Sequence, residues 1–443
     1  MNTLFTREKM HRLANVIHRI VIGGDAGART MQFAKNLTVS IVGGLGAFAL
    51  LFSANVVVAR VLGPEEYGLY SVFFSIAQIV SLLYVLELDV SALYFLSEKK
   101  EDKKGLMSSI LLMFGINIIV FSLLAESVFH FFHFVQMSQG VFLYALGFAV
   151  VFSTKRMMDA FLRADEKFVW QAILRLGEGI VVVIFLVIFM WGMHDRTFAS
   201  YALALTIAGG AFTIAGGIAT RRLLTVKAWD VEKMNTVFHY NAFGLINAVV
   251  NGVIKNADTL IIAAVLGVKT AGVYAVYFTA IVVIGARITQ LFVSVFFPSV
   301  RMHADRIQSV IAKIDRMCIR TFLPVVLFSG VGIACIVALY GNGYPFVWLW
   351  IFLGAVYMGV HFFASLYGWI LSSISQKGYK RYNLSFVFGF ITYASIICIA
   401  YVTQTVTITV FLIALITYRT VCGAIAFYHL RKNHSIWARD DVV

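Results

Sequence analysis

Long apolar runs recur along this chain, and they constrain its fold more than any other feature. A membrane-spanning helix needs about 20 mostly apolar residues, and twelve segments meet that length. The chain has 443 residues, of which 60% are hydrophobic and 13% charged, with a mean hydropathy of +0.86. A soluble protein of this size could not cover so much apolar surface, and runs of this length do not suit the short alternating strands of a β-barrel. The expected spans are 37–59, 69–96, 106–130, 140–160, 171–191, 199–220, 237–266, 272–297, 320–340, 345–373, 383–403 and 405–429.

A short tract between the first two spans occurs a second time between the seventh and eighth. The first copy runs from Ala59 to Val72 and the second from Ala263 to Val276, and both keep the same Ala, Val, Leu, Gly, Gly, Tyr and Val at matching positions. Each copy joins one long apolar segment to the next. An internal repeat of this kind in a hydrophobic chain indicates a two-lobed transporter.

The repeat divides the chain into two matching halves. Each half contains six predicted spans in the same order and orientation, so the halves are parallel repeats related by an axis along the membrane normal. We therefore predict an all-α integral membrane protein with about 12 transmembrane helices in two six-helix lobes. The expected parts are a basic N-terminal segment (1–36), an N-lobe (37–220), a basic linker (221–236), a C-lobe (237–430) and a tail (431–443).

The distribution of positive charge predicts the orientation in the membrane. Most of the 36 Lys and Arg residues lie in the terminal segments and in alternate loops, among them 99–104 and 301–320. By the positive-inside rule, both termini and these loops are cytoplasmic. The net charge of +14 then reflects topology and attraction to anionic membrane lipids. The sequence does not predict nucleic-acid binding, because it contains no basic patch interleaved with aromatic residues.

The first 36 residues leave two interpretations open. Apolar residues such as Leu13, Ile17 and Ile20 recur at helical spacing among basic ones, which is typical of an amphipathic helix on the cytoplasmic membrane surface. A disordered basic tail fits equally well. A signal peptide does not, because the apolar run starts late and no cleavage pattern follows it.

Patterns that carry enzymatic chemistry are missing from the sequence. The loops between the predicted spans are too short to hold a soluble catalytic domain. The four cysteines form no CxxC pair and the histidines show no metal-binding spacing, so neither a metal nor a cofactor is indicated. Gly23–Thr30 resembles a phosphate-binding loop only superficially, because it lacks the GK[ST] ending. We expect a protein that is not an enzyme.

Polar side chains form a stripe along the seventh predicted span. Asn247, Asn251 and Lys255 are spaced four residues apart and share one helical face with Asn241. Such a face does not point at lipid tails. We expect it to line a hydrated cavity, with the amides bound to sugar hydroxyls and Lys255 to an anion. The alternative is interhelical hydrogen bonding together with an ion pair between Lys255 and Asp258.

Other charges within predicted spans supply further candidates. Arg287 is a second candidate for substrate binding, since its planar guanidinium suits a phosphate, but it could equally pair with an acidic neighbour. Glu87, Asp89 and Asp258 are candidates for binding a coupling proton or cation, and the first two could instead be interfacial. Arg419 is expected to snorkel toward the basic end of its span.

Three motifs resemble those of one transporter family. The tract from Ala59 to Ser71 resembles the first external turn of polysaccharide flippases, the Wzx-type transporters of O-antigen, capsule and exopolysaccharide repeat units. Asp258–Ile262, with Gly267, Gly272 and Tyr274 after it, is similar to the seventh-helix turn of that family, and Leu162–Ala164 is similar to a pattern after the fourth helix. The family belongs to the MOP superfamily, with the multidrug MATE exporters and the lipid II flippase. Some members have fourteen spans, whereas twelve are predicted here.

The resemblance implies a V-shaped pair of bundles that work by alternating access in the cytoplasmic (inner) membrane. The implied substrate is an oligosaccharide on undecaprenyl diphosphate, with Lys255 and Arg287 serving the diphosphate or acidic sugars. A glycan polymerase and export machinery are implied partners. A MATE-like cation exporter is an alternative, although Lys255 and Arg287 do not fit its expected acidic cavity. A membrane-embedded glycan polymerase or ligase fits less well, because the external loops are short, and a membrane scaffold that transports nothing does not explain the intramembrane charges.

Overall fold

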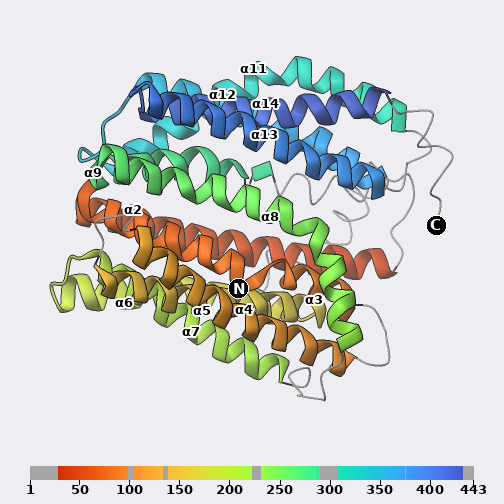
Figure 1. Cartoon of the computed structure of the whole chain (residues 1–443), viewed down its shortest axis with the longest axis horizontal. Coiled ribbons are helices and arrows are strands. Elements are labelled where there is room, and N and C mark those ends of the chain that lie inside the picture. Colours follow the sequence, from red (N-terminus) through yellow and green to blue (C-terminus); the bar gives the residue numbers. More distant parts are fainter. Residues whose placement is uncertain are drawn as a thin grey trace, which may run out of the picture.

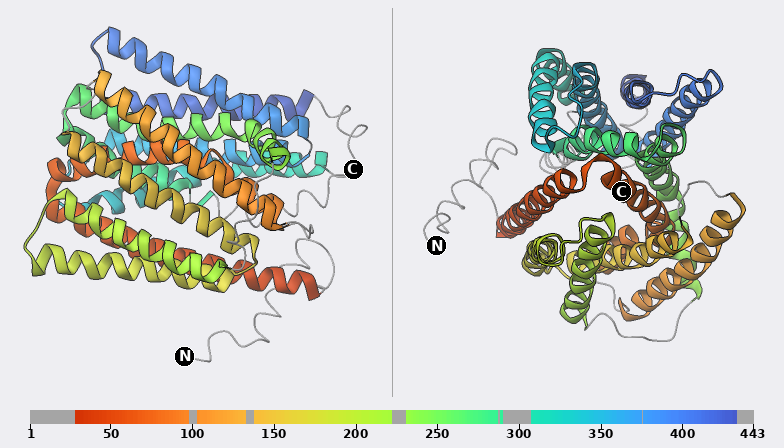
Figure 2. Two further views of the ribbon diagram at one scale, coloured as in Figure 1. Left: turned by 60° about the horizontal axis from the view of Figure 1, so that its bottom comes forward. Right: turned by 90° about the vertical axis from the view of Figure 1, so that its left-hand side faces the viewer.

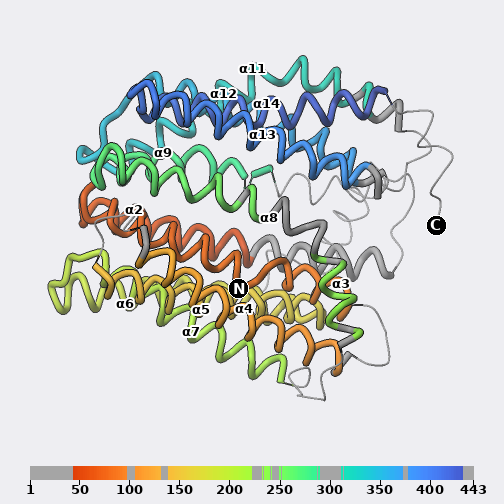
Figure 3. Tube along the Cα trace, viewed as in Figure 1, coloured from red at the N-terminus to blue at the C-terminus, as the bar shows by residue number. Residues whose placement is uncertain are grey.

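The computed structural model describes residues 28–97, 103–132, 138–221, 231–286, 288–289, 307–374 and 376–432 (Figure 3). The N-terminal segment up to residue 27 and most of the predicted linker therefore lie outside the described residues. Within a few of the helices only the backbone is described, and the side chains of Asn247 and Asn251 are in this group.

All regular structure in the described residues is helical, as the apolar runs predict. Ten of the helical stretches are long and apolar enough to cross a membrane. The N-terminal half contains α2 (Ala28–Val85), α3 (Leu88–Ser97), α4 (Lys103–Phe132), α5 (Gln139–Ala164), α6 (Phe168–Val187), the π-helical turn η1 (Ile188–Gly192) and α7 (Phe198–Thr220). The C-terminal half contains α8 (Val231–Leu266), α9 (Val268–Phe278), the π-helical turn η2 (Thr279–Val283), α11 (Ile307–Tyr340), α12 (Trp348–Ile374), α13 (Gln376–Val402) and α14 (Ile408–Lys432).

The first and second predicted spans form one long bent element. Helix α2 is 58 residues long and contains a single non-helical residue, Gly63, at φ 73° and ψ 175°. Glycine adopts a positive φ without the steric cost of a Cβ. Pro64 follows directly, at the start of the second part of the helix, where its missing N–H is tolerated. Gly267, at φ 90°, separates α8 from α9 in the same way, so both copies of the repeat make the same bend.

The two halves form separate bundles that meet along their inner helices. In Figure 1, α11, α12, α13 and α14 lie on one side of the molecule and α4, α5, α6 and α7 on the other, with α2, α8 and α9 between them. Contacts of α2 with α8 and α9 join the halves. Figure 2 shows the bundles diverging when the molecule is viewed along its helices.

Apolar side chains cover the outward faces of the bundles. Leu123 is 66% exposed on α4, and Phe328 is 80% exposed on α11. Such exposure would drive aggregation in water but suits contact with lipid tails. The chain is therefore a multi-pass integral membrane protein.

Candidate functional site

The two repeated turns pack against each other at one end of the molecule. A Cβ added to Gly68 would overlap the carbonyl oxygen of Val268, and one added to Gly272 would overlap that of Pro64. Gly68 and Gly272 are matching positions of the repeat, as are Pro64 and Val268. The contact is thus reciprocal and brings backbone against backbone. We call this end, on the left in Figure 1, the turn end; the charge pattern predicts that it is external.

Buried tyrosines surround this contact and connect the two halves. The Asn55 Oδ1 on α2 accepts hydrogen bonds from the Tyr67 hydroxyl at 2.9 Å and from the Tyr340 hydroxyl of α11 at 2.8 Å. The Tyr344 hydroxyl donates to the carbonyl oxygen of Ala59 at 2.9 Å. Tyr67 and Tyr340 are almost fully buried. A buried hydroxyl that loses its partner is costly, so these bonds hold the turn end together.

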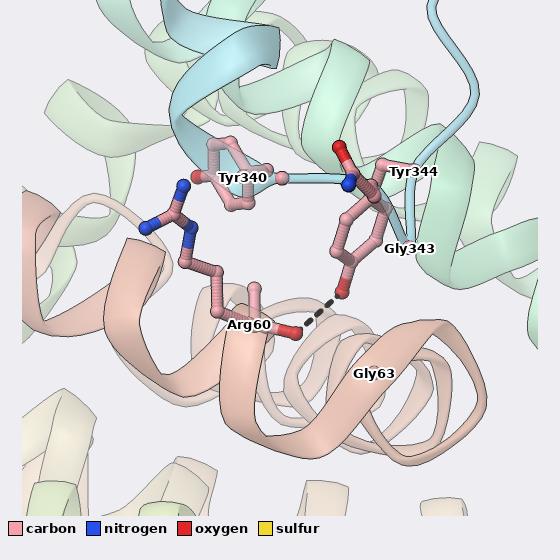
Figure 4. Close-up of a pocket in the computed structure, with 8 residues that line it drawn as sticks. Arg60, Gly63, Tyr340, Gly343 and Tyr344 are labelled. Carbon is pink, nitrogen blue, oxygen red and sulfur yellow. Dashed lines mark hydrogen bonds between the residues drawn. The ribbon is translucent and has the colours of Figure 1, made fainter.

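A cavity of about 270 Å³ opens beside this network (Figure 4). Arg60 and Gly63 line it from α2, and the loop from Gly341 to Tyr344 lines it from the other half. The Arg60 side chain lies along Gly341, with its Nε 3.2 Å from the position of an added Cβ. The cavity is too small for an oligosaccharide, and we interpret it as part of the packing at the turn end.

The two described side chains of the polar stripe predicted on the seventh span, Asn241 and Lys255, have different surroundings. Asn241 is 7% exposed and accepts a hydrogen bond from Ser91 of α3, so it lies in the packing between α8 and the N-terminal half. Lys255 is exposed. The side chains of Asn247 and Asn251 lie outside the described residues, as does Arg287, so their expected contacts with substrate stay predictions.

Asp258 is the most deeply buried acidic side chain described. It is 0% exposed, and its carboxylate accepts hydrogen bonds from the Tyr274 hydroxyl of α9, at 2.6 Å, and from the Tyr393 hydroxyl of α13. Among the described residues, no Lys or Arg forms an ion pair with it. The geometry therefore does not favour the alternative interpretation of the stripe, in which Asp258 forms an ion pair with Lys255. An uncompensated carboxylate between two hydroxyls is suited to hold a proton or a small cation.

Glu87 and Asp89 lie where the second span breaks. Leu86 and Glu87 both have positive φ, at 42° and 63°, and they separate α2 from α3. Arg156 of α5 binds Asp89 through two hydrogen bonds, of 2.7 and 3.1 Å, and its guanidinium lies 3.8 Å from Glu87. Asp89 is thus already neutralised by a bidentate partner, which makes it a weaker candidate for ion coupling than Asp258.

Arg419 corrects one expectation and reveals a feature that the sequence analysis missed. It is 8% exposed in the middle of α14 and therefore does not snorkel. Its guanidinium lies 4.9 Å from the Tyr418 ring centroid and 5.7 Å from that of Phe386. His361 of α12, also buried, lies within electrostatic reach of Arg419 and of Lys255. In the sequence each of these residues is recognisable only as an isolated polar residue in an apolar run, because Lys255, His361 and Arg419 belong to separate helices.

The two bundles, their bent inner helices and the reciprocal turns define a class of membrane-protein fold. The fold is similar to that of an inward-facing multidrug resistance MATE family transporter of the MOP superfamily, with a TM-score of 0.62, 12% identity, and coverage of 97% of this chain and 99% of the other. An outward-facing MATE transporter gives 0.55 at 14% identity, with coverage of 92% and 97%. A MOP superfamily transporter from Pyrococcus furiosus gives 0.55 at 13% identity, with the same coverage. The MATE-like fold therefore extends over nearly the whole chain.

Within that class, the sequence itself identifies the family. Residues 33–302 match the family described as polysaccharide biosynthesis protein. This is more than half of the chain, and the chain belongs to that family. Among curated proteins, none matches the sequence. The chain thus combines membership of the polysaccharide biosynthesis protein family with a MATE-like fold.

Proposed function

We propose that this protein moves lipid-linked oligosaccharide repeat units across the cytoplasmic membrane. The observation that carries the proposal is the combination of a polysaccharide biosynthesis family match with a two-lobed transporter fold. A glycan assembled on undecaprenyl diphosphate carries a polar head group that cannot cross hydrocarbon unaided. Buried polar residues of the two lobes, among them Asp89, Asp258 and Arg419, would contribute to a path for the head group, while the lipid tail stays in the bilayer.

The proposed mechanism is alternating access, in which the lobes rock about the inner helices. The reciprocal contact of Gly68 and Gly272 with the opposite turn closes the turn end. The higher similarity to the inward-facing MATE structure than to the outward-facing one supports assigning this state as inward-facing. Opening to the outside then requires the turns to separate and the hydrogen bonds of Asn55 to Tyr340 and of Tyr344 to Ala59 to break.

The proposed roles of the polar residues follow their positions. Lys255, with Asn247, Asn251 and Arg287, contacts the head group, and Asn241 acts mainly through its bond with α3. Asp258 is our preferred coupling residue, because it is buried without a basic partner among the described residues. Binding of a proton or cation there would change the hydrogen bonds that join α8 to α9 and α13.

Deleting the gene tests the function directly. We expect surface glycan to fall and lipid-linked oligosaccharide to accumulate on the cytoplasmic leaflet, as measured by mass spectrometry of extracted lipids and by protection from externally added glycosidase. Restoring the gene should reverse both changes. Normal surface glycan together with an unchanged lipid-linked pool would contradict the proposal.

A MATE-like cation exporter is the second candidate, and the buried carboxylate of Asp258 among tyrosines is the observation that favours it. Drug susceptibility distinguishes the two functions. An exporter predicts that the deletion strain becomes sensitive to cationic dyes, whereas a flippase predicts altered glycan with unchanged dye sensitivity.

A further inference from the structure

The interior of the C-terminal half contains a buried cation without an acidic partner. Arg419 is 92% shielded on α14, and within the described residues it forms no ion pair. Its Nε has no hydrogen-bond acceptor. The aromatic rings of Tyr418 and Phe386 stabilise the guanidinium from the sides. They leave at least one of its in-plane N–H donors unused, and such donors suit an oxygen ligand.

A second unused polar atom lies on the neighbouring helix. His361 of α12 is 7% exposed and stacks on Tyr357, with ring centroids 5.6 Å apart. Its Nδ1 has no hydrogen-bond partner in the described part of the chain. The ring lies within electrostatic reach of both Arg419 and Lys255. Helices α12 and α14 pack closely along their length, so these groups belong to one region.

A third helix contributes an amide with the same property. Asn383 of α13 is 6% exposed, and neither its Nδ2 nor its Oδ1 has a partner among the described residues. It lies one turn before Phe386, whose ring is beside Arg419. Buried polar groups normally find partners. Unsatisfied buried polar groups on three helices that pack against one another are suited to bind a polar ligand.

We propose that Arg419 and His361, with Lys255 nearby, form a binding site for an oxyanion of the transported substrate. All three groups can donate hydrogen bonds, and among the described residues no carboxylate pairs with Arg419 to compete with an anionic ligand. A phosphate oxygen or a sugar carboxylate has the required chemistry. The inference rests on the proposed function, and it places a specific anionic group of the head group inside the C-terminal lobe, between α12 and α14.

The experiment measures binding of inorganic diphosphate and of glucuronate to the full chain in lipid nanodiscs by isothermal titration. The variants are Arg419→Gln, which removes the charge, Arg419→Lys, which keeps the charge but not the planar fork, and His361→Gln. Arg431→Gln is the matched control, because Arg431 lies on the same helix but is exposed and pairs with Asp315. Thermal unfolding of each variant reports whether it folds.

We expect Arg419→Gln to weaken binding of the preferred anion at least tenfold, Arg419→Lys and His361→Gln to weaken it less, and Arg431→Gln to leave it unchanged. Preference for diphosphate assigns the site to the lipid carrier, and preference for glucuronate assigns it to an acidic sugar. Wild-type affinity in a folded Arg419→Gln variant would overturn the proposal. If that variant does not fold, wild-type affinity in both Arg419→Lys and His361→Gln would overturn it.

The outcome is separable from that of the proposed function. If the wild-type protein binds neither anion while the deletion strain accumulates lipid-linked oligosaccharide, the subsite is wrong and the flippase proposal stands. If anion binding depends on Arg419 while the deletion leaves all glycans normal, the flippase proposal is wrong and the anion site stands.

Discussion

Gly68 and Gly272 occupy the same position in two copies of one turn, and each lies against the backbone of the opposite copy. An added Cβ on Gly272 would lie 2.9 Å from the backbone nitrogen of Gly68, in addition to overlapping Pro64. The two lobes therefore approach at this point as closely as their main chains allow. Backbone cannot move aside as a flexible side chain can, so the space for closure at the turn end depends on both glycines.

Replacing Gly272 with Ala should hinder closure of the turn end. Overpacking of this kind costs about 1–3 kcal/mol, which corresponds to a population shift of about 5- to 150-fold away from the closed state. Closure can be measured by cross-linking two introduced cysteines, in a chain whose four native cysteines have been replaced. Glu65 and Lys269 are suitable positions for them, because they are exposed and occupy matching positions of the two turns. We expect less cross-linking and less glycan export in Gly272→Ala. Gly147→Ala is the control, because nothing lies within 4 Å of an added Cβ there; equal cross-linking in the two variants would contradict the prediction.

Replacing Asn55 with Ala should weaken the same closed state by a different route. The change leaves the buried hydroxyls of Tyr67 and Tyr340 without their acceptor, at a cost of about 1–3 kcal/mol. The same cross-linking assay should show reduced closure, and membrane abundance should stay near normal. Ser127→Ala is the comparison, since Ser127 is exposed and bonds only to its own helix at Leu123. Full closure in Asn55→Ala would refute the assigned role of this residue.

Asp258→Asn tests ion coupling with little change in volume. The amide can still accept one tyrosine hydrogen bond, but it cannot bind a proton or neutralise a cation, so transport driven by an ion gradient should fall at least tenfold if Asp258 is the coupling group. The measurement is uptake of lipid-linked glycan analogue into proteoliposomes with imposed proton or sodium gradients. Asp195→Asn is the control, because Asp195 is exposed and its carboxylate accepts hydrogen bonds from Thr197 in its local turn. A wild-type response to both gradients would exclude Asp258.

Lys255→Ala should lower glycan export without lowering protein abundance. The exposed ammonium on α8 is the proposed contact for an anionic group of the head group, and its removal weakens binding while leaving the buried packing of α8 intact. Export is measured as surface glycan per copy of the protein. Lys269→Ala removes an equal charge at the turn end and should export normally. Unchanged export in Lys255→Ala would remove this residue from the proposed site.

The sequence predicted the helical spans and the repeat well, because both depend on local patterns. The bend at Gly63 and Pro64 could be predicted from the residues themselves, and its copy at Gly267 from the repeat. The contact between the two turns could not, since nothing in either turn indicates which surface it will meet. The pairing of Arg156 with Asp89, and the electrostatic influence of Arg419 on His361, depend on helices that the sequence alone does not place together.

Arg419 shows that the distance of a residue from the end of its helix does not by itself predict where its side chain lies. Its separation from the basic end of α14 permits snorkelling, but aromatic neighbours from α13 and from its own helix enclose it instead. Asn241 was expected in a cavity and lies against Ser91 of the other half, because α8 passes between the lobes and not only along one of them. Helical periodicity identifies a polar face, whereas the partner of that face is decided by the tertiary packing.

The reciprocal contact at Gly68 and Gly272 has the geometry of an isologous interface, in which one surface binds a second copy of itself. In a symmetric dimer of half-length chains, the same turn would meet its own image without any further adaptation. Fusion of two such chains would preserve the contact while freeing each half to change separately. The buried polar residues of the C-terminal half, such as Asp258 and Arg419, could then diverge while the matched turns continued to fit each other.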